Sequence, residues 1–186
     1  GSIGSLTAVS DKVYRATFTP TADSTTDGVI SVASSKFSDS AGNENADGSS
    51  SDNTLTLSVD TVRPTLAITS SASSLKAGET TTVTFTLSEA STDFVESDIS
   101  VSGGALSNFA ASSSTVYTAT FTPTVDSTTD GVISVASSKF SDSAGNENAD
   151  GSDSNNTLTL SVDTVRPTIA ITSSASSLKA GETTTV

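Results

Sequence analysis

The sequence repeats itself at an offset of 103 residues, and this repeat constrains the fold more than any other feature. The segment Tyr14–Val83 matches Tyr117–Val186 at 65 of 70 positions. A period of this length far exceeds that of a solenoid unit and suits one whole small domain. We therefore expect consecutive copies of one domain. The five differences between the copies are at Arg15, Ala22, Ser50, Asp52 and Leu66.

The joins between copies are marked by Pro64 and Pro167, each of which follows the sequence Asp-Thr-Val-Arg. Placing the boundaries there predicts three parts. Residues 1–61 are the C-terminal part of a first repeat, residues 62–164 form a complete repeat, and residues 165–186 begin a third. Because these parts fall short of two full periods, we expect the chain to be a window from a longer tandem array.

Composition alone leaves disorder open, because the chain contains 39 Ser and 32 Thr and only 5% aromatic residues. The placement of the apolar residues favours strands instead. Along Thr82–Leu87, Val83, Phe85 and Leu87 alternate with threonines, which is the period of a half-buried strand. The same pattern or a shorter apolar run occurs at Leu66–Ile68, Ile99–Val101, Leu106–Phe109, Tyr117–Phe121, Val132–Val135 and Leu158–Val162.

Seven short strands in about 103 residues predict an all-β fold made of tandem immunoglobulin-like β-sandwich domains. Turn sequences such as Gly103-Gly104 and Asp130-Gly131 separate the strands. The threonine faces would be the solvated sides of the sheets. Tyr14 and Tyr117 lie within alternating strands, so we expect both to pack in the core.

The charge and the missing residue types exclude several functions. The net charge is −13, with only 8 Lys and Arg, so we expect neither nucleic-acid binding nor attraction to an anionic membrane. No apolar stretch is long enough to span a bilayer. The chain has no His and no Cys, which removes the commonest general base and the thiol nucleophile. We expect no enzyme and no obligate oligomer, and the predicted partners are neighbouring repeats of the same chain.

The acidic residues are expected to gather at the domain junctions. If each strand reverses the previous one, the loops sort to a near pole, beside the preceding linker, and a far pole, beside the following one. The junction at Asp60 then receives Glu89, Asp93 and Asp98 from one near-pole loop and Asp142 from another. The aspartates at the far poles are Asp23 and Asp27 in the first repeat and Asp126 and Asp130 in the second.

Several carboxylates in one small volume repel each other unless a cation neutralises them or they take up protons. Oxygen ligands without His or Cys favour Ca²⁺ over transition metals. The alternative is that these loops are ordinary solvated surface, since no EF-hand spacing occurs in the sequence. The residues alone leave both interpretations open.

Three segments carry a resemblance to a known family: VDTVRPTLAIT, TVTFTLSEASTDFVESDISVSGG and FSDSAGNEN. Together they resemble the bacterial immunoglobulin-like extender repeats of giant RTX-type adhesins from Gram-negative bacteria, including marine species. The resemblance covers the whole chain. It implies Ca²⁺ at the linkers between adjacent β-sandwiches. Position by position, it implies Asp60, Glu89, Asp98 and Asp142 as linker ligands, with Asp39 and Asp163 at the equivalent positions of neighbouring junctions.

The resemblance also implies a passive extracellular role in cell attachment and biofilm formation. The segment would be a calcium-stiffened spacer that projects a distal ligand-binding domain away from the cell surface. The alternative function is a calcium-dependent carbohydrate- or ligand-binding β-sandwich module. Such modules usually present aromatic platforms, whereas the two tyrosines here are expected in the core.

Overall fold

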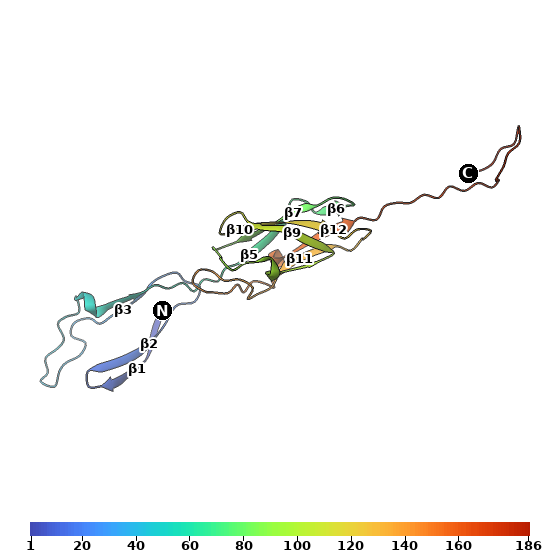
Figure 1. Ribbon diagram of the computed structural model, residues 1–186. Coiled ribbons are helices and arrows are strands. Elements are labelled where there is room, and N and C mark those ends of the chain that lie inside the picture. Colours follow the sequence, from blue (N-terminus) through green and yellow to red (C-terminus); the bar gives the residue numbers. More distant parts are fainter.

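The computed structural model describes all 186 residues as an elongated chain with one β-sandwich at its centre (Figure 1). Short 3₁₀ turns occupy Ser51–Asn53, Glu96–Asp98 and Ser154–Asn156. No helix in the structure has the length and hydrophobicity of a membrane span. The strands are β1 (Ser2–Ser10), β2 (Val13–Thr19), β3 (Gly28–Ser31), β4 (Thr54–Leu57), β5 (Leu66–Ser70), β6 (Ser74–Lys76), β7 (Thr81–Leu87), β8 (Ile99–Ser102), β9 (Gly104–Ala111), β10 (Val116–Pro123), β11 (Gly131–Val135) and β12 (Thr157–Asp163).

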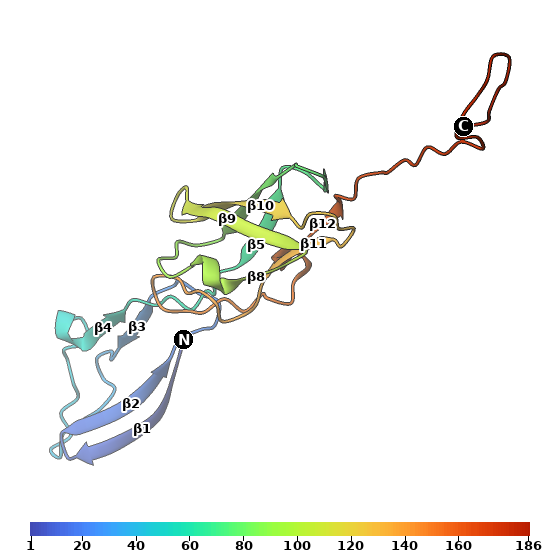
Figure 2. The ribbon, with the colours of Figure 1, turned by 45° about the vertical axis from the view of Figure 1, so that its right-hand side comes forward.

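Strands β5 to β12 form the central sandwich from two four-stranded sheets (Figure 2). One sheet has the order β5-β7-β10-β9 and the other has the order β6-β12-β11-β8. Neighbouring strands are antiparallel except β12 and β6, which run parallel. The predicted all-β immunoglobulin-like sandwich is therefore confirmed.

The alternating apolar residues form the core between the sheets, as the sequence pattern predicts. Along β7, Val83, Phe85 and Leu87 are at most 3% exposed, whereas Thr82 and Thr86 face solvent. The register places Phe85 opposite Tyr117 of β10. Such burial of apolar side chains is the main favourable term in folding.

The structure contains one strand that the sequence analysis missed. Strand β6 has only three residues, and Leu75 is its single buried side chain. Three residues are too few to show alternation, so the pattern could not separate this strand from the neighbouring turn. Its pairing with the distant β12 supplies the hydrogen bonds that define it.

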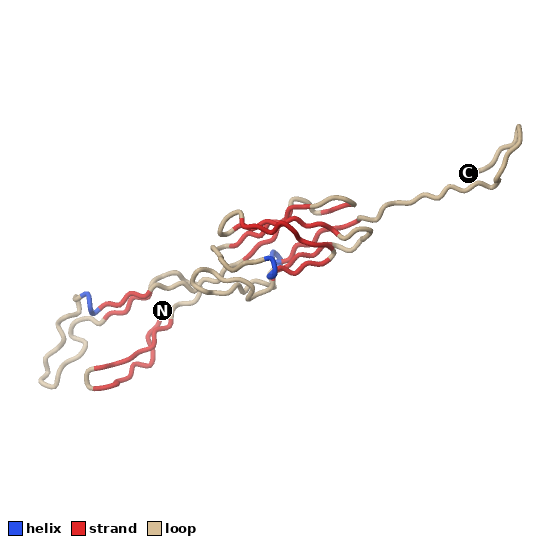
Figure 3. The backbone as a smooth tube through the Cα atoms, viewed as in Figure 1, coloured by secondary structure: helices blue, strands red, loops and turns tan.

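Residues 1–61 adopt the second half of the same sandwich (Figure 3). β1 pairs with β2, and β3 pairs with β4, as β9 pairs with β10 and β11 with β12. These residues contain no counterparts of β5 to β8, so their apolar face is uncovered. Tyr14 is 62% exposed, whereas the equivalent Tyr117 is 6% exposed. The expected core position is thus confirmed for Tyr117 and wrong for Tyr14.

Residues 165–186 continue beyond the sandwich and contain no assigned strand (Figure 1). Their sequence matches that of β5, β6 and the start of β7. Ile169 and Ile171 are 87% and 81% exposed, although the equivalent Leu66 and Ile68 are buried. These side chains therefore lack the neighbours that cover their counterparts in the complete repeat.

Candidate metal centre at the domain junction

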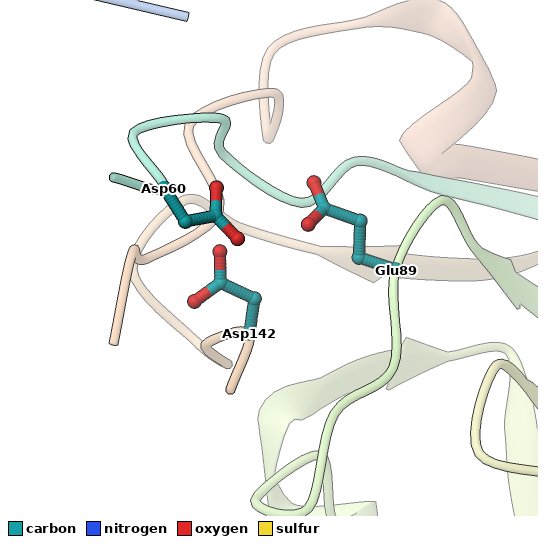
Figure 4. Close-up of side chains that lie close together, drawn as sticks. All are labelled: Asp60, Glu89 and Asp142. Atoms are coloured by element: carbon teal, nitrogen blue, oxygen red, sulfur yellow. The ribbon is translucent and has the colours of Figure 1, made fainter. Parts of the chain in front are cut away.

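Three carboxylates meet where the linker joins the first repeat to the central sandwich. Asp60 lies on the linker, Glu89 follows β7, and Asp142 lies in the long loop between β11 and β12. One carboxylate oxygen from each residue lies within 4.8 Å of those of the other two. Figure 4 shows the three side chains pointing toward one another from separate segments of the chain. The sorting of loops to poles predicts that these three residues meet.

Aromatic packing holds the loop that carries Glu89. Phe94 in this loop is 3% exposed and packs edge-to-face against Phe85, Tyr117 and Phe140, with ring centroids 5.1 to 5.8 Å apart. The Tyr117 hydroxyl donates a 3.0 Å hydrogen bond to the carbonyl oxygen of Ser91. Because the loop is fixed to the core at both residues, the backbone at Glu89 has little freedom to move away from the junction.

The loop that carries Asp142 is organised by Asn148, whose side chain is fully buried. The Asn148 Oδ1 atom accepts hydrogen bonds from the amides of Lys139 and Phe140, and its Nδ2 atom donates to the Ala136 carbonyl and to Asp150. Phe140 enters the aromatic cluster two residues before Asp142. Asp142 is therefore attached to the same core as Glu89.

Asp142 itself closes a tight turn. Its Oδ1 atom accepts hydrogen bonds from the amides of Ala144 and Asn146, and its Oδ2 atom accepts one from Asn146 Nδ2 at 2.8 Å. The equivalent Asp39 makes the same contacts to Ala41 and Asn43. The turn forms identically in the open first repeat, so the local Asp-x-Ala-Gly-Asn sequence specifies it without help from the rest of a sandwich.

Glu89 and Asp142 differ in how their environment affects their pKa. Burial raises the pKa of Glu89, and the nearby charges of Asp60 and Asp142 raise it further. Burial also acts to raise the pKa of Asp142, but hydrogen bonds from Asn146 and the turn amides outweigh it and leave that pKa lowered. Asp142 is thus held as an anion, and its repulsion of Glu89 contributes to the raised pKa of Glu89.

One oxygen of the cluster has no protein partner. Glu89 Oε1 is buried and accepts no hydrogen bond. A buried acceptor without a partner is costly, and buried carboxylates are normally paired or bound to a metal. The charges of Asp60 and Asp142 act on Glu89, so a bound cation would supply the partner that this oxygen lacks.

The linker makes two further contacts with the long loop of the sandwich. Asn146 Nδ2 donates to the Asp60 carbonyl at 3.2 Å, and Arg63 donates to the Glu147 carbonyl at 3.3 Å. The sequence pattern does not single out Arg63 or Asn146 as junction contacts. Both bonds join residues more than eighty positions apart, and no local pattern in the sequence indicates such a pairing.

The other predicted ligands lie outside the three-carboxylate cluster. Asp98 accepts a hydrogen bond from the Val95 amide at 2.9 Å, which turns its carboxylate toward its own loop. Asp93 accepts hydrogen bonds from Ser91 and from the Ser141 amide and hydroxyl. The remaining predicted ligands are exposed and belong to no such cluster: Asp23, Asp27, Asp39, Asp126, Asp130 and Asp163.

The donor set consists of carboxylate oxygens. Ca²⁺ accepts about six to eight oxygen ligands in adaptable geometry. Three carboxylates from three segments, one of them with an unpartnered buried oxygen, fit the hard oxygen chemistry of this ion. A cation held by all three residues would therefore require the linker and both loops to be in place together.

Comparison with known proteins agrees with the fold. The family model described as "Bacterial Ig-like domain" matches residues 1–56 and again residues 60–159. Together these two matches cover most of the chain and correspond to its repeats. No curated protein matches the sequence.

Proposed function

The chain belongs to the bacterial Ig-like domain family, and we propose that it is a spacer segment of a bacterial surface adhesin whose domain junctions are stiffened by calcium. Domains of this family are typically surface modules that act structurally and not as enzymes. The more specific assignment, an extender of an RTX-type adhesin on a Gram-negative cell, rests on the resemblance of the linker and loop sequences. Near-identical consecutive domains suit a device whose useful property is length.

The observation that carries the proposal is the position of the three-carboxylate cluster. Asp60 belongs to the linker, whereas Glu89 and Asp142 belong to the following sandwich. A cation that binds all three residues connects one domain to the next. Without the cation, the charges of Asp60 and Asp142 act on Glu89, and this repulsion favours separation of the linker from the sandwich.

Calcium bound in this way also stabilises the folded domain. A ligand that binds only the folded form adds about 2.7 kcal/mol at a hundredfold excess over its Kd. We propose that the chain is loosely held in a calcium-poor cytosol and becomes rigid after export into calcium-rich medium. Each junction would then become rigid only outside the cell, where the spacer is needed.

Small-angle X-ray scattering with excess calcium and with EGTA tests the proposal. We expect EGTA to shorten the maximum dimension and to increase the flexibility of the chain. Asp60→Ala should produce the same change in the presence of calcium. Asp163→Ala is the matched control, because it alters the equivalent linker position, after which no sandwich follows. Identical scattering of the unmodified chain in calcium and in EGTA would contradict the proposal.

A further inference from the structure

The linker is also attached to the domain that it leaves, through contacts that need no metal. The Thr61 hydroxyl donates a 2.7 Å hydrogen bond to the Thr21 carbonyl and accepts a 3.0 Å hydrogen bond from the Ser24 amide. The Thr61 amide donates to the Ser24 carbonyl at 3.0 Å. One threonine therefore closes the turn Thr21–Ser24 around the start of the linker.

The same arrangement occurs one repeat later. The Thr164 hydroxyl donates to the Thr124 carbonyl at 2.7 Å and accepts from the Ser127 amide at 2.8 Å, and the Thr164 amide donates to the Ser127 carbonyl at 2.9 Å. Thr164 is only 3% exposed. No sheet follows this linker in the structure. The contacts therefore form without a following domain, and they belong to the preceding one.

The other end of the linker is fixed in the following sandwich. Pro64 is fully buried, the Thr65 carbonyl accepts from the Ser88 amide, and the Leu66 amide donates a 2.6 Å hydrogen bond to Asp150. Between Thr61 and Pro64 only Val62 and Arg63 remain. Neither residue has the threonine clamp or the burial of Pro64. The Val62 amide donates to Asp60 Oδ1 within the linker at 3.2 Å, and Arg63 contacts the following sandwich through a side-chain hydrogen bond to the Glu147 carbonyl.

We propose that Thr61 is a positioning residue that clamps the linker to the preceding domain independently of metal, and that it thereby confines the calcium-controlled hinge to Val62 and Arg63. This inference rests on the proposed spacer function. Thr164 performs the same role for the next junction. Calcium then has only a two-residue hinge to immobilise, instead of a linker that is free from the end of β4 onward.

Threonine suits this role for a physical reason. Its hydroxyl can donate one hydrogen bond and accept another, as both copies do here. Its β-branched side chain restricts rotation about χ1 and so fixes the direction of the hydroxyl. Valine has nearly the same shape but can make neither hydrogen bond, and serine keeps both.

Amide hydrogen exchange measured by NMR on Thr61→Val and Thr61→Ser, in saturating calcium, tests the clamp. Because Thr61→Val loses the hydroxyl contacts, its Ser24 amide should exchange roughly tenfold faster. The Ser127 amide, held by the intact Thr164, is the control within the same molecule and should not change. Thr61→Ser should behave like the unmodified chain. Equal Ser24 exchange in all three proteins would overturn the proposal.

The distance distribution between two spin labels tests whether the clamp confines the hinge to Val62 and Arg63. The chain contains no Cys, so Thr25→Cys and Ser112→Cys provide two unique labelling sites on either side of the junction. In saturating calcium, Thr61→Val should broaden the distance distribution, while Thr61→Ser should leave it narrow. An unbroadened distribution for Thr61→Val would overturn the assigned role, even if Ser24 exchanges faster.

Two controls separate the possible failures. Unchanged protection of the amides in the β1–β2 and β3–β4 pairs, which belong to the repeat that Thr61 clamps, shows that Thr61→Val remains folded. If Thr61→Val is not folded, the Thr164→Val variant tests the same clamp within the complete repeat. Unchanged exchange of the Ser127 amide in Thr164→Val would then overturn the proposal. If EGTA fails to broaden the distribution of the unmodified chain, the calcium function is wrong. Comparison of Thr61→Val with Thr61→Ser in EGTA still tests the clamp.

Discussion

Glu89 is the residue whose ionisation is most closely linked to the junction. Its pKa is raised above the ordinary value of 4.5 by burial and by the charges of Asp60 and Asp142. In the metal-free chain, its contribution to stability is therefore fully present below about pH 4.5 and is lost as the pH rises through the raised pKa. Calcium would bind the deprotonated form, so protons and calcium would compete for this residue.

Glu89→Gln should remove this pH dependence. In EGTA near neutral pH, we expect the variant to have a larger free energy of unfolding than the unmodified chain, because Gln carries no charge to bury. The difference should disappear on acidification to about pH 4. In calcium the order should reverse, because the variant loses a ligand. Urea denaturation across this pH range measures both effects.

Glu96→Gln is the matched control for this experiment, because Glu96 lies in the same loop and is exposed. It should leave stability nearly unchanged in both solutions. A Glu89→Gln difference that is the same at all pH values would contradict the linkage.

The sequence predicted the meeting of Asp60, Glu89 and Asp142, because strand reversal alone assigns loops to poles. It could not predict which acids of those loops turn toward the junction. Asp98 is turned away by a local hydrogen bond to the Val95 amide. That choice depends on side-chain rotamers in a closed 3₁₀ turn, and the order of residues along the chain does not reveal it.

At the scale of elements, Asp150 joins the long loop to the first strand of the sandwich. It is 8% exposed and accepts hydrogen bonds from the Leu66 amide at the start of β5 and from Asn148 Nδ2. Removing the carboxylate leaves two buried donors without a partner. The loop that carries Asp142 is thus coupled to the strand that follows the linker.

Asp150→Ala should lower the free energy of unfolding by about 2–3 kcal/mol, the cost of losing hydrogen bonds to a buried charged group. It should also weaken calcium binding, because the Asp142 loop loses an attachment. Chemical denaturation and calcium titration measure the two effects. Asp47→Ala changes the equivalent position in the first repeat, which is exposed, and should have little effect. Equal losses for the two variants would contradict the coupling.

The elements themselves were largely predictable. Seven strands follow from apolar alternation or apolar runs, since each places several side chains between the sheets. Strand β6 was not predictable, because its three residues bury only Leu75 and pair with the distant β12. Exposure of Tyr14 was also not predictable from its own strand, because it depends on whether a second sheet covers that face.

At the scale of the whole molecule, the net charge of −13 is not spread evenly. Three carboxylates meet at the junction between the first repeat and the central sandwich, and the linker aspartate recurs one repeat later as Asp163. Under the proposed function, a divalent cation there would offset charge where domains approach each other. Length, stiffness and dependence on calcium would then all be properties of one repeated joint.

Calcium should raise the midpoint of thermal unfolding in a concentration-dependent way. The expected gain is about 2.7 kcal/mol at a hundredfold excess over Kd. Magnesium should produce a smaller shift, because it demands near-octahedral geometry and loses its water reluctantly. Asp60→Ala should reduce the calcium shift. Differential scanning calorimetry measures it, and a midpoint that does not respond to calcium would contradict the account.

The most direct measurement is the anomalous-scattering map of crystals grown in calcium. We predict a peak about 2.3–2.6 Å from carboxylate oxygens of Asp60, Glu89 and Asp142. The same crystals of Asp60→Ala should show a weakened peak or none. Ordered carboxylates at this junction with no anomalous peak between them would contradict the central claim that calcium joins one domain to the next.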